Sequence, residues 1–129
     1  MGVLLLSNVV TSVASRIGAI TLASADITNA VSTLSQITSN QNDYSLGSGD
    51  ILRISSDAAR DITGLVATTG GDARLLVNVG SFDITLKHQS ASSTAVNRFL
   101  CAGASDYTLS AGASAPVVYD ATSAGWRVG

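Results

Sequence analysis

Side chains able to do acid–base or nucleophilic chemistry are few in this sequence. It has one histidine, His88, one cysteine, Cys101, and no glutamate, so all nine acidic residues are aspartates. Hydrolytic sites need a nucleophile paired with a base, or two carboxylates at a set separation. A Cys101–His88 dyad is a pairing that the sequence leaves open. Because the neighbours of Cys101 are apolar, we expect a small buried side chain there rather than an activated thiolate, and no catalytic site.

The sequence also gives little evidence for a metal-binding or phosphate-binding site. Asp57, Asp61 and Asp72 could meet a calcium ion together with loop carbonyls, but no run of alternating aspartates of the calcium-loop kind is present. Residues 47–49 (Gly-Ser-Gly) lack the lysine of a phosphate loop, and residues 70–71 (Gly-Gly) indicate a turn. A single cysteine excludes an intrachain disulfide and a multi-cysteine metal site. We therefore expect no metal and no cofactor.

The charge distribution excludes further classes of partner. Seven basic residues against nine acidic ones give a net charge of −2, and the six arginines are scattered along the chain. Nucleic-acid binding needs clustered Arg and Lys to neutralise phosphates, so we expect none. No stretch reaches the ~20 apolar residues of a membrane-spanning helix. The apolar start, residues 1–6, lacks the positive residues of a signal peptide, and we interpret it as a buried or partner-contacting arm.

The composition predicts a β-rich chain that gains stability from self-association. Hydrophobic residues make up 46% of the chain, but aromatic residues only 5%. Much of the apolar stock is alanine, which contributes little when buried because the driving force scales with apolar area. Thr favours strands, and Ser and the twelve Gly favour turns. Burial between subunits would compensate for the thin core of a lone monomer.

The first third of the chain carries a regular apolar spacing. Steps of three and four residues, interrupted at Ser24, connect Val3, Leu6, Val10, Val13, Ile17, Ile20, Ile27, Val31 and Leu34. Such steps are typical of a seam between supercoiled helices, although Gly18 and the β-branched residues disfavour one continuous helix. We predict a short helix over residues 25–38 with Ser24 as its N-cap. It packs either on copies of the same chain or on its own domain.

Residues 42–129 are predicted to form an antiparallel β-sandwich or jelly-roll-like domain, with residues 1–41 as an anchoring and oligomerisation arm. Short apolar or alternating runs separated by Gly-containing turns carry this prediction. The expected strands cover residues 44–46, 50–55, 61–66, 73–79, 82–88, 97–101, 107–109, 116–119 and 125–128.

A carbohydrate-binding module is the alternative function. It would require an exposed aromatic platform, for which Tyr44, Tyr107, Tyr119 and Trp126 are the candidates. Trp126 lies in the expected last strand, where a core position is the more frequent role.

Two parts of the sequence resemble structural proteins of tailed bacteriophages. Residues 10–27 are similar to a segment widespread in tail-fibre proteins, with matches at Val10, Ser12, Val13, Arg16, Gly18, Ala19, Thr21, Leu22, Asp26 and Ile27. The segment departs from the pattern at Ser15 and Ile17. A β-domain of fibre and appendage proteins is similar to residues 61–65, 75–81, 84–86, 97–99 and 117–128.

This resemblance implies a non-enzymatic virion protein at the particle surface. It implies a homotrimer that binds other capsid or tail proteins and in some cases host-surface glycans. If the chain starts at its natural Met, it is too short for a long tail fibre, and a head fibre, a capsid decoration or a short tail appendage is then expected.

Overall fold

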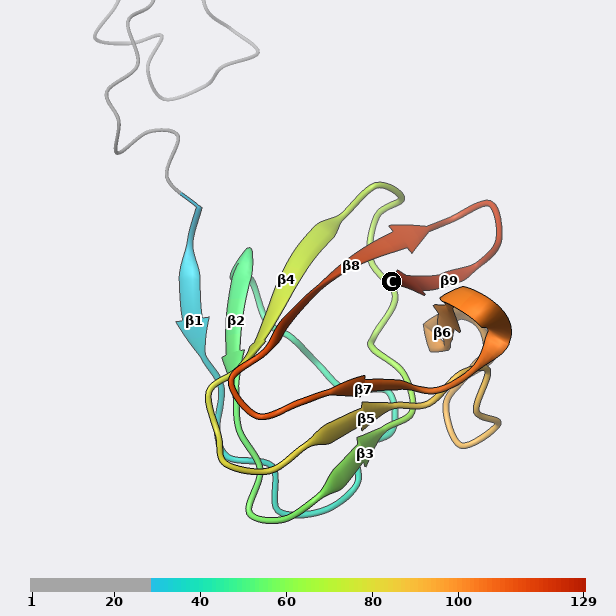
Figure 1. The fold of residues 1–129 in the computed structure, drawn as a ribbon. Helices are drawn as coiled ribbons and strands as arrows, with labels where there is room; N and C mark the ends of the chain where they lie inside the picture. The colour runs from blue at the N-terminus through green and yellow to red at the C-terminus, as the bar shows by residue number, and fades with distance from the viewer. Residues whose placement is uncertain (1–28) are drawn as a thin grey trace, which may run out of the picture.

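The computed structural model describes residues 29–129, and this part of the chain is mainly β (Figure 1). Its strands are β1 (Val31–Thr33), β2 (Ile51–Ile54), β3 (Arg60–Ile62), β4 (Ala73–Asn78), β5 (Ile84–Leu86), β6 (Phe99–Cys101), β7 (Tyr107–Leu109), β8 (Ser114–Asp120) and β9 (Gly125–Val128). Two single-turn 3-10 segments, η3 (Ala95–Asn97) and η4 (Ala102–Ala104), flank β6. The prediction of a mainly β chain is confirmed.

The chain first winds into a solenoid-like stack of coils. Strands β1, β2 and β4 pair in parallel, and so do β3 and β5. Val31 pairs with Ile51, and Ile51 pairs with Leu75, so equivalent positions recur after 20 and then 24 residues. We call residues 29–46 the first coil, residues 50–66 the second coil and residues 73–88 the third coil. Parallel bridges at Ile37, Gln41 and Tyr44 continue the pairing of the first coil with the second around its whole length.

Antiparallel strands then close the stack. β8 pairs antiparallel with β4, β9 pairs antiparallel with β8, and β6 lies parallel to β9. The result is a six-stranded sheet in the order β1-β2-β4-β8-β9-β6 and a three-stranded sheet in the order β3-β5-β7. Pro116 in β8 lies beyond Val117, the last β8 residue that pairs with β9, so its missing N–H removes no bond to that neighbour.

The core lies between the two sheets and is built from stacked positions of successive coils. Leu52 and Leu76 are register partners in the large sheet, and Ile62 and Leu86 are partners in the small one. All four are fully buried. Burying a side chain of this size contributes ~1.5–3 kcal/mol, so repetition of Leu and Ile at the same coil position supplies much of the stability.

The predicted helix over residues 25–38 is wrong where the structure describes it. Residues 29–38 form β1, an irregular segment over residues 34–36 and the bridge at Ile37. Leu34 packs against the core, and Ile37 is 2% exposed, whereas Val31 is 59% exposed. Leu34 and Ile37 are three residues apart, which matches the spacing of a helix. Both side chains point inward because the chain turns a corner of the stack between them, and no helix is needed.

The sandwich prediction also requires correction. After β2 the chain turns a corner of the stack and forms β3 before it returns to the large sheet as β4. Because a full coil separates β2 from β4, the two strands are parallel rather than antiparallel neighbours. Every antiparallel strand pair in residues 29–129 includes β7, β8 or β9, and one isolated antiparallel bridge joins Gly64 to Arg98. The predicted division at residues 41/42 falls inside the first coil, and both sides of it pair with the second coil.

Candidate functional site

His88 and Cys101 lie side by side, but their geometry is not that of a catalytic dyad. The imidazole Nδ1 of His88 accepts a hydrogen bond from the backbone N–H of Cys101, at 3.0 Å. The thiol of Cys101 is instead directed at the backbone carbonyl of Leu86, at 3.8 Å. Burial raises the pKa of the Cys101 thiol. The thiol is therefore held in its protonated form, and His88 acts as a cap on a backbone amide.

A small hollow lies next to this pair and is lined by His88, Leu100, Cys101, Ala102, Arg127, Val128 and Gly129. Its charged side chain, the guanidinium of Arg127, is held by the carboxylate of Asp120 at 2.9 Å. On the other side of His88, the carboxylate of Asp106 accepts a bond from the His88 backbone N–H and pairs with Lys87. These charges are engaged with one another rather than directed into the hollow.

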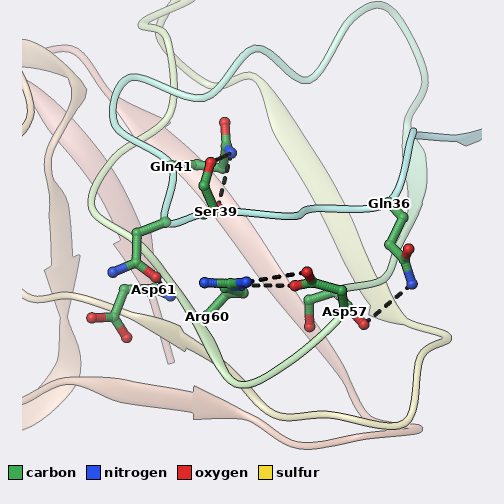
Figure 2. A network of polar contacts seen from close by, with 8 residues as sticks. Gln36, Ser39, Gln41, Asp57, Arg60 and Asp61 are labelled. Atoms are coloured by element: carbon green, nitrogen blue, oxygen red, sulfur yellow. Dashed lines mark hydrogen bonds and ion pairs between the residues drawn. The ribbon is translucent and has the colours of Figure 1, made fainter.

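The three aspartates considered for calcium do not converge. Figure 2 shows Asp57 in a two-bond ion pair with Arg60, with distances of 2.8 and 3.1 Å, while the carboxylate of Asp61 points away from that pair. The hydrogen bond from Arg60 is the main cause that lowers the pKa of Asp57. Asp72 pairs with Arg74 at 2.8 and 3.0 Å. Within residues 29–129, no group of three His, Cys, Asp or Glu side chains could hold a metal ion.

The glycine turn over residues 47–49 connects the first two coils. One guanidinium nitrogen of Arg74 donates to the carbonyls of Gly47 and Gly49, at 3.0 and 2.7 Å. A Cβ at Gly49 would lie 2.4 Å from the hydroxyl oxygen of Ser32, so glycine is required by the close approach of the two coils. Asp72 orients Arg74 for this contact. The turn is a structural clamp, not a phosphate loop.

The candidate aromatic residues are mostly inside the fold. Trp126 is fully buried, its ring lies edge-on to Tyr119 at 5.2 Å, and its indole N–H donates to the carbonyl of Leu65. Tyr44 and Tyr107 pack against the core and are partly buried. The aromatic side chain that lies exposed is Phe82, at 45%. The predicted strand over residues 82–88 included Phe82, but β5 begins at Ile84 and Phe82 lies in the bend before it.

Sequence reasoning missed a polar cluster that ties the end of the first coil to the segment around η3. The carboxylate of Asp43 accepts hydrogen bonds from the Thr94 backbone N–H and hydroxyl and from the Asn97 amide, at 2.8–3.1 Å. The bond from Asn97 is the main cause that lowers the pKa of Asp43. Ser93 bonds to the Asp43 backbone N–H and to Thr63. The residues are 50 or more positions from Asp43 or come from another coil, so only their spatial arrangement identifies the cluster.

The apolar positions assigned to oligomerisation fall largely outside the described residues. Val3, Leu6, Val10, Val13, Ile17, Ile20 and Ile27 lie in residues 1–28. Of the two that are described, Val31 faces outward on β1 and Leu34 packs against the core. The structure therefore separates two positions that the helical spacing placed on one seam.

Comparison with known proteins gave no match: no protein-family model, no curated protein and no solved structure is significantly similar to this chain. In residues 29–129, no helix has the length and apolar character needed to cross a bilayer.

Proposed function

We propose that this chain is a non-enzymatic structural protein of a tailed-phage virion. It serves as a fibre or as a capsid or tail decoration at the particle surface, and it is anchored through its N-terminal part. Its partners are copies of itself, in the homotrimer that the sequence resemblance implies, and neighbouring capsid or tail proteins.

One observation carries the proposal: the stretches that resemble phage appendage domains are successive parts of a single stack. Residues 61–65 contain the end of β3, residues 75–81 contain most of β4, and residues 84–86 are β5. Residues 117–128 supply the closing hairpin of β8 and β9. Their apolar side chains are mostly buried, Ile62, Leu76, Ile84 and Trp126 among them. A resemblance carried by framework positions supports a shared scaffold rather than a shared reaction.

The ion pairs made by four aspartates also support a non-enzymatic role. Asp57, Asp72, Asp106 and Asp120 are each paired with a basic side chain of the same chain. Enzyme sites instead hold titratable groups toward a cleft with perturbed protonation. The Lys87–Asp106 and Arg127–Asp120 pairs join neighbouring strands, and the other two pairs join residues two or three positions apart.

The glycan-binding alternative is not favoured by the placement of its candidate residues. A sugar platform needs an exposed ring face, and Trp126 and Tyr119 are inside the core. We therefore put forward no second function.

Particle incorporation tests the proposal. The phage that encodes the chain would be grown with the native gene and with a variant lacking residues 1–12, and particles would be labelled with an antibody against residues 42–129. We expect label on native particles and its loss from the variant, with Thr108→Ala, a change at an exposed position of β7, as the control that keeps the label. Unchanged incorporation of the deletion variant would overturn the anchoring role, and absence of label from native particles would overturn the virion assignment.

A further inference from the structure

Within residues 29–129, the first coil leaves one edge of the six-stranded sheet open. β1 is the terminal strand of that sheet (Figure 1). The carbonyl of Ala30 accepts from Ile51, and the N–H of Leu34 donates to Arg53, both at 3.0 Å. Because backbone groups alternate sides along a strand, the even-numbered residues bond to β2, and Val31 and Thr33 direct their N–H and C=O groups away from it. Both residues are exposed.

The opposite edge of the same sheet is closed. β6 is the terminal strand there. The backbone N–H of Cys101 is capped by the imidazole of His88, and the carbonyl of Phe99 accepts from the N–H of Gln89, both at 3.0 Å. The fold therefore satisfies the backbone groups of one edge internally and leaves those of β1 without such a cover within residues 29–129.

β1 is only three residues long, and the open edge carries none of the side chains that keep sheet edges apart. Native edge strands are commonly protected by Lys, by Pro or by inward-pointing charges. Residues 29–42, which include β1 and most of the first coil, contain no charged residue and no proline. The first charge after this run, Asp43, is bound to Thr94 and Asn97. Val31 presents an apolar side chain that is 59% exposed beside the free backbone groups.

We propose that the open edge of β1 is an interface between two copies of this chain, paired antiparallel about a twofold axis at Ser32. Val31 of one copy then lies opposite Thr33 of the other, and these two residue pairs exchange about four backbone hydrogen bonds across the axis. Val and Thr are β-branched, and such cross-strand pairs are favourable. The six-stranded sheets of the two copies become one continuous sheet.

Charge is the reason that the partner is a second copy. A copy brings the same side chains to the contact, so any charge on the edge would meet its own sign. An uncharged run of fourteen residues removes that repulsion, and it offers nothing to attract a partner of opposite charge. The β1 contact would join two chains in addition to any contact made by residues 1–28. It therefore goes beyond the proposed function, and either proposal can fail without the other.

Sedimentation of the full chain over a dilution series tests the interface. Val31→Lys/Thr33→Lys places Lys opposite Lys in the pair, and Thr33→Pro removes an outward N–H without removing a bond to β2. We expect each variant to have about half the mass of the native assembly at the same concentration. The matched control is Thr108→Lys/Val118→Lys, which adds the same charge at two exposed positions away from β1 and should keep the native mass.

Amide hydrogen exchange provides a readout independent of the variants. The amides of Val31 and Thr33 should become protected as concentration rises, whereas that of Ser32, which faces β2, should be protected throughout. A native assembly of unchanged mass in both β1 variants, or one whose Val31 and Thr33 amides exchange freely, would overturn the interface and leave the virion proposal standing. If these two amides are protected equally at all concentrations, the edge of β1 is covered by another part of the same chain. That outcome would also overturn the interface.

Discussion

The indole N–H of Trp126 donates a 2.9 Å hydrogen bond to the backbone carbonyl of Leu65, across 61 positions of sequence. The bond joins the closing strand β9 to the end of the second coil, and both residues are fully buried. The bond adds a side-chain contact to the β4–β8 and β5–β7 pairings that join the antiparallel part of the chain to the coils.

Replacing this indole tests the role of the bond. Trp126→Phe keeps an aromatic ring but leaves the buried Leu65 carbonyl without its donor, and an unsatisfied buried group costs ~1–3 kcal/mol in addition to the lost packing. We expect the free energy of unfolding, measured by urea denaturation, to fall by at least that amount. Tyr119→Phe is the control, because its hydroxyl bond to the Val96 carbonyl is only partly buried and should be worth ~0.5–1.5 kcal/mol. Equal stability of the two variants would contradict the role given to Trp126.

Asn78 is a buried polar residue of the core, and its replacement by Asp should make stability depend on pH. Its amide nitrogen donates to the carbonyls of Phe82 and Leu109, at 2.8 and 3.0 Å, so a carboxylate there would face two acceptors in a fully buried place. Burial of this kind raises the pKa of a carboxyl group. The free energy of unfolding of Asn78→Asp should therefore fall as pH rises from ~4 to ~7, because the unfolded chain ionises more readily.

The control for this change is Asn40→Asp at an exposed position. The side-chain oxygen of Asn40 accepts from the backbone N–H of Asp61, and a carboxylate can accept the same bond. Chemical denaturation at several pH values compares the two. A flat pH response of Asn78→Asp would show that water reaches the site.

Asp120 should stabilise the closing hairpin in a pH-dependent manner. Hydrogen bonds from the backbone of Ser123, and then the bond from Arg127, lower the pKa of Asp120 from 3.8 to about 2. Since the folded pKa is below the unfolded one, the contribution is complete above pH ~4 and is lost as pH falls through ~2. Asp120→Asn should be less stable than the native chain at pH 7, and the difference should shrink toward pH 2. Thermal unfolding across this range measures it, and a constant difference would refute the assignment.

Cys101 should react slowly in the folded protein. The residue is 6% exposed, and burial raises the pKa of its thiol, so thiolate is scarce and hard to reach. At pH 8 we expect iodoacetamide to modify the native chain at least about tenfold more slowly than the chain unfolded in urea. Equal rates would mean that the thiol is accessible and would reopen the Cys101–His88 pair as a reactive site.

Much of the element map follows from local sequence. The alternation around β5, the apolar run of β4 and the turn between β8 and β9 each predict a strand or turn that the structure contains at nearly those residues. The local pattern is enough to predict these elements because one face of a strand is buried and the other is exposed. Apolar and polar side chains therefore alternate along the strand. The same reasoning failed at residues 31–38, where a corner of the stack produced a spacing that matches a helix.

The partners of each strand were decided by tertiary structure. Whether β2 meets β4 in parallel or antiparallel depends on where the intervening turns direct the chain, and Gly, Ser and Asp in those turns are compatible with both outcomes. The polar cluster at Asp43 and the exposed turn position of Phe82 likewise depend on residues far apart in sequence. By itself the sequence determined a β-rich chain of low charge with little reactive chemistry, because composition and periodicity act residue by residue. The parallel coils, the capped edge at His88 and the open edge at β1 arise only once distant segments are brought together, because pairing between strands is a property of both partners.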